Sequence, residues 1–236
     1  MSLLELERVG RSVRQGAHER VVLRDVSLQL ESGELLAVWG VRHSGRSMLL
    51  RVAAGIEPAD SGVVRFAGQA LSARCGEMLG KGIAYCSNAA GSGEAHEVLD
   101  ELMMGQLARG VPRALSRARA VAALERAGAE RCGARASHEL DRAEAVRVRI
   151  AGALVLAPSL LVIEEPTRAV DLLERDAILA LLRSLADEGL AVLMSAGEAT
   201  ALSGADRALA LTNGVLRGSV TPELAPVLTL RARARA

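Results

Sequence analysis

Three kinds of residue are scarce in this 236-residue sequence. Aromatic residues make up 1% of it, Lys81 is the only lysine, and there are three cysteines. Arginine therefore carries nearly all of the positive charge, a bias that we interpret as compositional rather than functional. Cys75, Cys86 and Cys132 stand apart, with no C-x-x-C pair and no histidine at ligand spacing. They are predicted to be reduced thiols rather than metal ligands.

Long apolar runs are absent as well. No stretch approaches the ~20 residues that a membrane-spanning helix needs. Charges interrupt the N-terminal segment MSLLELERVG, so we expect no signal peptide there. The net charge is +1, so no overall field favours nucleic acid as a partner. The length and a hydrophobic content of 50% fit one α/β domain with a subdomain, and any membrane role is expected to depend on a partner protein.

The stretch from Leu35 to Leu50, LLAVWGVRHSGRSMLL, carries the clearest pattern. An apolar run stops at Gly40, and Gly45-Arg46-Ser47 opens a second apolar run with helical spacing. This order is typical of a P-loop, G-x-x-x-x-G-K-S, with arginine in the place of the lysine. Glycines allow backbone N–H groups to surround phosphates, and the N-terminus of the following helix adds partial positive charge. The pattern predicts a phosphate-binding loop between a buried strand and a helix.

A second motif lies about 120 residues downstream. Leu160 to Ile163 is fully apolar, as in a strand that is buried within a parallel sheet. Two acids, Glu164 and Glu165, follow at its carboxyl end, and Pro166-Thr167 and Asp171 come next. We expect this strand to lie beside the P-loop strand, with its acids close to bound phosphates.

The remaining periodicity predicts the other elements. Alternation marks Leu3–Val9, expected at a sheet edge, and Val21–Leu30, both as antiparallel strands that flank the buried strand at Leu35. Helical spacing runs from Glu94 to about Cys132, with a break at 110–112, and again over 141–157. We expect one domain over residues 1–220, with a helical subdomain at about 89–157, and a solvated tail at 221–236. Strands are also predicted at 62–67, 83–86 and 190–194, helices at 47–54 and 172–186, and a hairpin at 208–220.

Together these segments resemble the nucleotide-binding subunit of an ABC transporter, over nearly the whole chain. VVLRDVSLQLESGELLAVWG is similar to the family's opening, IAYCSN to its Q-loop strand, and RVRIAGALVLAPSLLVIEEPTRAVD to its stretch from the signature helix through Walker B to the D-loop. The segment from His96 to Ala129 resembles cassettes of the lipoprotein-release and macrolide-export type. The resemblance implies an α/β fold: a P-loop NTPase core with a mostly parallel sheet, an antiparallel β subdomain and an inserted helical subdomain, with ATP and Mg²⁺ as ligands.

The resemblance also implies a set of site residues. Glu165 matches the catalytic base, and Ser47, Glu164 and Asn88 match the ligands of Mg²⁺. Asn88 stands at the Q-loop glutamine, and Gly197 at the switch histidine. The nucleotide is further expected to contact the phosphate loop and the signature segment: Gly40, Val41, Arg42, His43, Ser44, Gly45, Arg46, Ser47, Met48, Leu140, Asp141, Arg142 and Ala143.

Several of these positions depart from the family's pattern. Arg46 replaces the P-loop lysine, and its planar fork does not occupy the lysine's place in the loop. Gly197 lacks the switch imidazole, and Asp141-Arg142-Ala143 replaces a hydroxyl and two glycines. We favour a degenerate cassette that binds nucleotide weakly and hydrolyses it poorly or not at all. The alternatives are a working transport ATPase with divergent motifs, or a P-loop regulator without a transporter.

The resemblance implies two protein partners and no nucleic acid. A transmembrane ABC subunit is expected to insert a coupling helix in a cleft between Asn88 and about Arg113. A second cassette, either this chain or an active paralogue, is expected to complete a dimer whose sites form between the two. The chain is then expected in the cytoplasm, peripheral on the inner face of the cell membrane. Cassettes do not bind the cargo, so the sequence leaves the transported substrate open.

Overall fold

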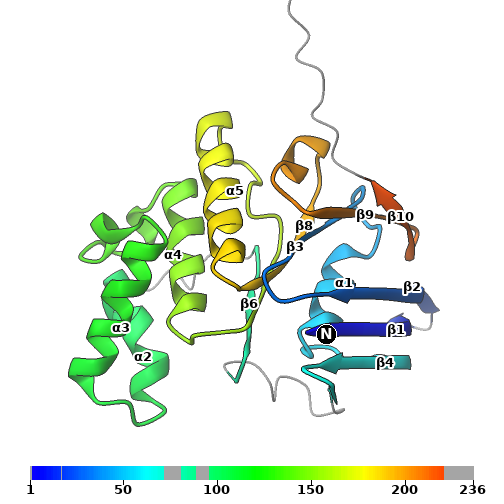
Figure 1. Ribbon diagram of the computed structural model, residues 1–236, viewed down its shortest axis with the longest axis horizontal. Helices are drawn as coiled ribbons and strands as arrows, with labels where there is room; N and C mark the ends of the chain where they lie inside the picture. Colours follow the sequence, from blue (N-terminus) through cyan, green and yellow to red (C-terminus); the bar gives the residue numbers. More distant parts are fainter. Residues whose placement is uncertain (1, 17, 72–80, 89–95, 221–236) are drawn as a thin grey trace, which may run out of the picture.

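The computed structural model describes residues 2–16, 18–71, 81–88 and 96–220, which form two sheets and a group of helices (Figure 1). Three expectations fall outside the described residues: the tail at 221–236, the thiol of Cys75 and the start of the helical subdomain at 89–95. Within the described ranges, no helix is both long and apolar enough to span a membrane.

A six-stranded sheet runs through the middle of the fold. Its strand order is β10-β9-β3-β8-β7-β6, and all neighbours are parallel except β10 and β9. Every residue of β7 and β8 is buried, which explains the continuous apolar runs in their sequences. The predicted parallel strand at Leu160 is confirmed, but the expectation that it lies beside the strand of the phosphate loop is wrong, because β8 pairs with both and lies between β3 and β7. The bounds are β3 Leu35–Trp39, β6 Ile83–Cys86, β7 Leu160–Ile163, β8 Ala191–Ala196, β9 Arg207–Thr212 and β10 Val215–Val220.

The register of this sheet brings four strand ends to one edge. Trp39 pairs with Ala196, Met194 with Ile163, and Ile163 with Cys86. Because these strands are parallel, the segments that come after β3, β8, β7 and β6 begin side by side. Those segments hold the phosphate loop, Gly197, Glu164 with Glu165, and Asn88.

A second sheet, of four antiparallel strands in the order β2-β1-β4-β5, lies on the other side of α1 (Figure 1). Leu6 of β1, Leu36 of β3 and Leu49 of α1 belong to one buried cluster, so α1 packs between the two sheets. The expectation that the first strand is an edge strand flanking Leu35 is wrong, because β1 pairs with β2 on one side and with the distant β4 on the other. The bounds are β1 Leu4–Gln15, β2 His18–Leu30, α1 Arg46–Ala53, β4 Ser61–Phe66 and β5 Gln69–Ala70.

The helical region has the predicted break. α2 ends at Leu107 and α3 begins at Arg113, directly after Pro112, which has no N–H to donate within a helix. The helices α2, α3 and α4 stand together beyond β6, and α5 contacts both α4 and the sheet (Figure 1). The helix bounds are α2 Val98–Leu107, α3 Arg113–Arg126, α4 Arg142–Leu154 and α5 Leu172–Asp187, with short 3₁₀ turns at Glu130–Cys132, Ser137–Glu139 and Ala199–Leu202.

Two glycines with nearly the same φ angle, Gly62 and Gly68, allow a test of how closely β4 packs against β1. Gly62 has φ +79° and a Cβ there would lie 2.3 Å from the carbonyl oxygens of Glu7 and Arg8, whereas Gly68 has φ +77° and open space around it. We expect Gly68→Ala to lower the free energy of unfolding by about 1 kcal/mol, since only backbone strain is added. Gly62→Ala is expected to cost at least about 2 kcal/mol more, because the strands must separate. Equal losses in urea unfolding would contradict this close approach.

Candidate nucleotide-binding site

The phosphate loop predicted from the sequence joins β3 to α1. Gly45 has φ +108°, in the left-handed region that favours glycine. A Cβ at Gly40 would lie 2.5 Å from the carbonyl oxygen of Leu211, so this position also requires glycine. Gly45 directly precedes α1, and the loop therefore ends at a helix N-terminus, whose free N–H groups favour an anion.

A recess of about 250 Å³ lies against this loop. Ser44, which lines it, has a buried hydroxyl with no hydrogen-bond partner among the described residues. Free N–H groups of a helix and an unpaired hydroxyl are donors that suit a phosphate group. The recess is lined by Arg20, Val22, Val41, His43, Ser44, Gly45, Arg46, Ser47 and Met48.

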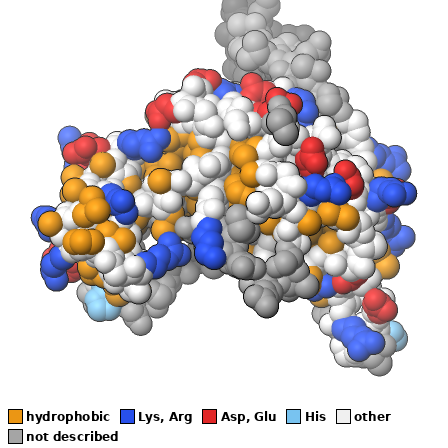
Figure 2. Space-filling view, turned by 60° about the horizontal axis from the view of Figure 1, so that its bottom comes forward, with side chains coloured by type: hydrophobic (Ala, Val, Ile, Leu, Met, Phe, Trp, Pro, Cys, Tyr) orange, Lys and Arg blue, Asp and Glu red, His pale blue; other side chains and the backbone are white. Residues whose placement is uncertain are grey.

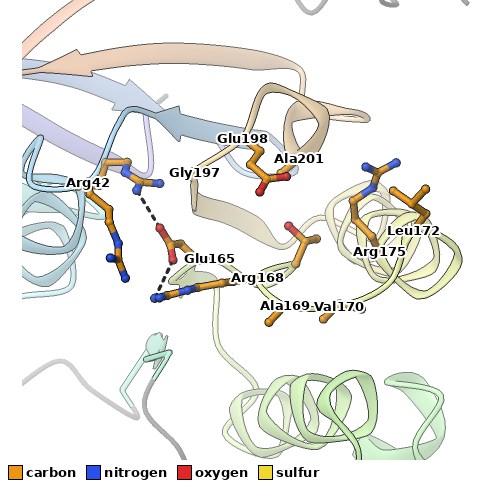
Figure 3. Close-up of a pocket in the computed structure, with 12 residues that line it drawn as sticks. Arg42, Glu165, Arg168, Ala169, Val170, Leu172, Arg175, Gly197, Glu198 and Ala201 are labelled. Atoms are coloured by element: carbon orange, nitrogen blue, oxygen red, sulfur yellow. Dashed lines mark hydrogen bonds and ion pairs between the residues drawn. The ribbon is translucent and has the colours of Figure 1, made fainter.

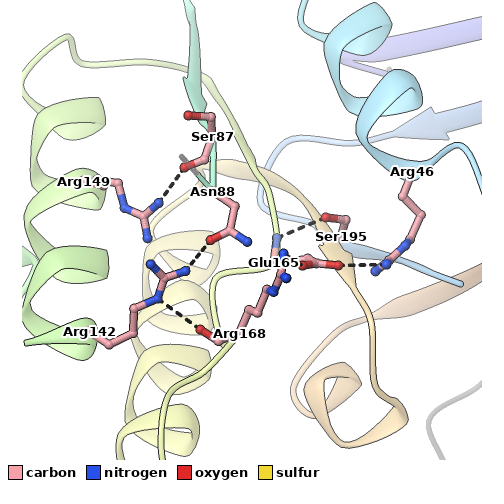
Figure 4. A network of polar contacts seen from close by, with 8 residues as sticks. All are labelled: Arg46, Ser87, Asn88, Arg142, Arg149, Glu165, Arg168 and Ser195. Carbon is pink, nitrogen blue, oxygen red and sulfur yellow. Dashed lines mark hydrogen bonds and ion pairs between the residues drawn. The ribbon is translucent and has the colours of Figure 1, made fainter. Parts of the chain in front are cut away.

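Arg46 points toward the acids that come after β7 (Figure 4). Its Nη2 lies 2.8 Å from Oε1 of Glu165, and the residue is only 7% exposed. Its Nη1 is buried and has no hydrogen-bond partner among the described residues. A Cβ at Gly197 would lie 3.6 Å from this Nη1, so the guanidinium occupies the space beside the missing switch side chain. The substitutions at 46 and 197 are thus spatially coupled.

Glu165, the expected catalytic base, is held on three sides. Its backbone has φ +39°, and its N–H donates to Oγ of Ser195 over 3.1 Å. Oε1 is paired with Arg46, and Oε2 lies 3.3 Å from Nη1 of Arg168. A general base must accept a proton from water within hydrogen-bond reach. Here both carboxylate oxygens already face guanidinium groups.

A second pocket, of about 360 Å³, opens on the other side of Glu165 (Figure 3). Four arginines and two glutamates line it, so its walls carry net positive charge: Arg42, Arg46, Arg168, Arg175, Glu165 and Glu198. Arg46 lines both this pocket and the recess over the phosphate loop. Its side chain therefore borders both spaces.

Glu164, the expected Walker B carboxylate, is 8% exposed and is bound by side chains from two other elements. The hydroxyl of Tyr85 donates to its Oε1, and Nε of Arg51 lies 3.9 Å from the same oxygen. Burial, with the hydrogen bond to Glu164 as a further cause, raises the pKa of Tyr85 well above its ordinary value. The hydroxyl therefore stays protonated and remains a donor at neutral pH.

Asn88 and Arg142 bind one another within the chain (Figure 4). Nη2 of Arg142 donates to Oδ1 of Asn88, and its Nε donates to the backbone oxygen of Arg168 over 3.2 Å. Nearby on α4, Nη1 of Arg149 donates to the backbone oxygen of Ser87 over 2.6 Å. The start of α4, which the resemblance assigns to a partner's nucleotide, is tied to the Q-loop segment and the D-loop of its own chain.

The other residues at the signature positions, Leu140, Asp141 and Ala143, make contacts that stabilise the helical subdomain. Asp141 is the N-cap of α4, and its carboxylate accepts a hydrogen bond from the Glu144 N–H over 2.8 Å. Ala143 is buried in the core of the helical subdomain, and the half-buried Leu140 packs against the same core. An aspartate at this position therefore has a structural reason that involves no nucleotide.

Two of the three residues expected to hold Mg²⁺ have an oxygen atom that is already hydrogen-bonded within the chain. Of their oxygens, Oε1 of Glu164 receives the Tyr85 hydroxyl, and Oδ1 of Asn88 receives Arg142. Ser47 is exposed at the first turn of α1. Among the described residues, no group of three acidic, histidine or cysteine side chains is arranged to hold a metal ion.

Four residues of the site were not expected from the sequence. Tyr85, Arg51 and Ser195 reach the acids only through tertiary packing, since they lie on β6, α1 and β8. The contact between Arg168 and Glu165 could have been predicted from the sequence, because the two residues are only three positions apart.

Comparison with known proteins identifies the family of the chain. The model of the ABC transporter family matches residues 23–168, which is more than half of the chain. The chain therefore belongs to the ABC transporter family, and its fold is that of an ATP-binding cassette. The lipoprotein-releasing system ATP-binding protein LolD of Shewanella oneidensis is 33% identical over 223 residues, covering 91% of this chain and 96% of the relative. The taurine import ATP-binding protein TauB of Pseudomonas aeruginosa is 33% identical over 185 residues, covering 78% and 68%.

Solved structures share the fold at lower identity. The ATP-binding cassette MJ0796, in a dimeric post-hydrolysis state bound to ADP and Pi, superposes with a TM-score of 0.82 at 21% identity, covering 93% of this chain and 99% of that one. CbiO1 of Clostridium perfringens, part of the transporter complex cbiONQ, has a TM-score of 0.83 at 23% identity, covering 94% and 89%. The α/β fold class is thereby confirmed.

The coupling between Arg46 and Glu165 can be measured with a double-mutant cycle. For Arg46→Ala and Glu165→Ala we expect a coupling free energy of about 2 kcal/mol in urea unfolding, since the arginine is almost fully buried. The matched control is the exposed pair Arg126–Glu188, whose atoms approach to 2.5 Å and whose side chains are 48% and 52% exposed. There we expect about 0.5 kcal/mol. Similar coupling free energies for both pairs would show that Arg46 and Glu165 interact no more strongly than an exposed ion pair.

Proposed function

We propose that this chain is the cassette subunit of a membrane ABC transporter complex, with weak or absent ATP hydrolysis and a structural or regulatory role. The observation that carries this proposal is the pairing of Glu165 with Arg46 on one oxygen and with Arg168 on the other. The phosphate loop keeps a backbone path and hydrogen-bond donors that suit a nucleotide. In contrast, both carboxylate oxygens of Glu165, the expected base, are paired with arginines. Loss of one preorganised catalytic group typically costs about 3 kcal/mol in barrier, or more than a hundredfold in rate.

A working transport ATPase is the second candidate, and one observation favours it. Nη1 of Arg46 is buried and unpartnered within the described part of the chain, so it is available to a phosphate oxygen. If nucleotide draws Arg46 away, Glu165 keeps only the more exposed Arg168 as a partner. In that case Ser47 and Glu164 would serve Mg²⁺ and Glu165 would orient water.

The proposed membrane partner is supported by apolar side chains on the helical subdomain. Met104 and Leu107 of α2 and Leu115 of α3 are 48%, 38% and 45% exposed. Figure 2 shows hydrophobic side chains gathered on this end of the molecule, bordered by basic ones. We propose that a coupling helix of a transmembrane subunit docks here, which would hold the chain at the inner face of the membrane. LolD and TauB are named for lipoprotein release and taurine import, so their names suggest no common cargo.

A second cassette is the other proposed partner. Leu172 and Leu173, at the start of α5, are 68% and 83% exposed, and Val41 of the phosphate loop is 67% exposed. Leu172 lines the arginine-lined pocket and Val41 lines the recess over the phosphate loop, and apolar side chains at such exposure support a contact with another protein. We propose a cassette dimer that uses this face, formed either by two copies or with an active paralogue.

Steady-state phosphate release by the purified chain, alone and with its membrane subunit, tests the proposed function. We expect turnover below about 0.1 per second, because ordinary enzymes begin near 1 per second and the base is engaged here. Glu165→Gln is the control, and it is expected to change this low rate less than about twofold. Turnover near 1 per second that disappears in Glu165→Gln would instead establish a working ATPase.

Arg46→Lys alone is expected to leave hydrolysis within about threefold of the unmodified chain. The lysine removes one cation from Glu165, but Arg168 remains on its other oxygen and position 197 still has no side chain. The measurement is the same phosphate-release assay, with nucleotide binding followed in parallel to confirm that the loop is intact. Recovery of turnover to 1 per second or more in this single variant would contradict the proposal.

A further inference from the structure

Two of the oxygen atoms expected to hold a magnesium ion, Oε1 of Glu164 and Oδ1 of Asn88, are already used by cationic or protonated donors. Oε1 of Glu164 accepts from the Tyr85 hydroxyl and faces Arg51, and Oδ1 of Asn88 accepts from Arg142. An arginine does not lose its proton in a protein, so it cannot give way by deprotonation. Mg²⁺ requires near-octahedral oxygen ligands. Its entry would therefore have to break interactions that tie together four elements of the fold.

The charge of this cluster points the same way. Arg46 and Arg168 pair with Glu165 and Arg51 lies near Glu164. Arg142 binds Asn88 and the backbone oxygen of Arg168, so the four arginines and two glutamates of this group leave a formal charge of +2. A magnesium ion would supply that same charge to a bound polyphosphate. Adding the ion to a partly buried cluster that is already cationic is unfavourable. Guanidinium groups can bind phosphate oxygens directly and in pairs, and so neutralise them without a metal.

Arg46 provides the link from this cluster to the phosphate loop. It lines the recess over the loop and also the arginine-lined pocket, and its buried Nη1 has no partner among the described residues. An unpaired buried donor favours an acceptor such as a phosphate oxygen. We infer that this chain binds a nucleoside triphosphate as the metal-free anion, with guanidinium groups in the place of Mg²⁺. This inference rests on the proposed nucleotide binding by the cassette and specifies the form of its ligand.

Binding of a fluorescent N-methylanthraniloyl derivative of ATP tests the inference. We titrate the full chain with this probe in excess EDTA and in millimolar MgCl₂, and we expect binding to be at least about tenfold weaker in MgCl₂, because Mg²⁺ converts the probe to its metal complex and depletes the free anion. Tyr85→Phe/Arg142→Ala removes the hydrogen-bond donors to Oε1 of Glu164 and Oδ1 of Asn88 and leaves only the more distant Arg51 near Glu164. In this variant Mg²⁺ is expected to tighten binding by at least about tenfold. Arg126→Ala removes an arginine from an exposed ion pair on α3, and it should behave like the unmodified chain in both conditions.

A second measurement follows the metal itself. Electron paramagnetic resonance of Mn²⁺ with a non-hydrolysable ATP analogue and the full chain is expected to show only the signal of the metal–nucleotide complex in solution. A protein-bound Mn²⁺ signal in the unmodified chain, or binding in MgCl₂ that is within about threefold of that in EDTA or tighter, would overturn the inference while leaving the proposed function intact. Absence of probe binding in both conditions would also overturn it. Rapid hydrolysis would overturn the proposed function instead, so the two failures are distinguishable.

Discussion

The main-chain hydrogen bonds between β3, β8, β7 and β6 hold four strand ends in one register, and the candidate site is built from the residues directly after those ends. A shift of one residue in any of these pairings would move Glu165, Gly197 or Asn88 away from the phosphate loop. The strands keep their register because they are buried on both faces, where an unpaired backbone group is costly. The geometry of the site is therefore a consequence of the core.

Arginine defines the electrostatics of the site. Arg46 and Arg168 pair with Glu165, Arg51 lies near Glu164, and Arg142 joins Asn88 to the D-loop. The planar guanidinium has five donors and a permanent charge, so one side chain can join two elements. A compositional preference for arginine over lysine would thus have physical consequences here. With arginine at these positions, both carboxylate oxygens of Glu165 are paired.

Much of the fold could be predicted from the sequence. The apolar run at Leu160–Ile163, the glycines at 40 and 45, and the break before Pro112 each follow from local rules about burial or backbone angle. The position of β1 could not, because its second neighbour β4 comes from a distant part of the chain. In the site, the sequence identified Arg46 and Gly197 as separate departures. Their contact depends on β3 and β8 being neighbours.

The sequence by itself determined the family, the phosphate loop and the acids after β7, because these depend on residue type and spacing along the chain. Only the tertiary structure decided what those residues contact. The pairing of Glu165 with Arg46, the Tyr85 hydrogen bond to Glu164, and the Arg142 contact with Asn88 each join residues 54 or more positions apart. Such contacts depend on side-chain reach and on the space left by neighbours such as Gly197. Spacing along the chain contains no information about either.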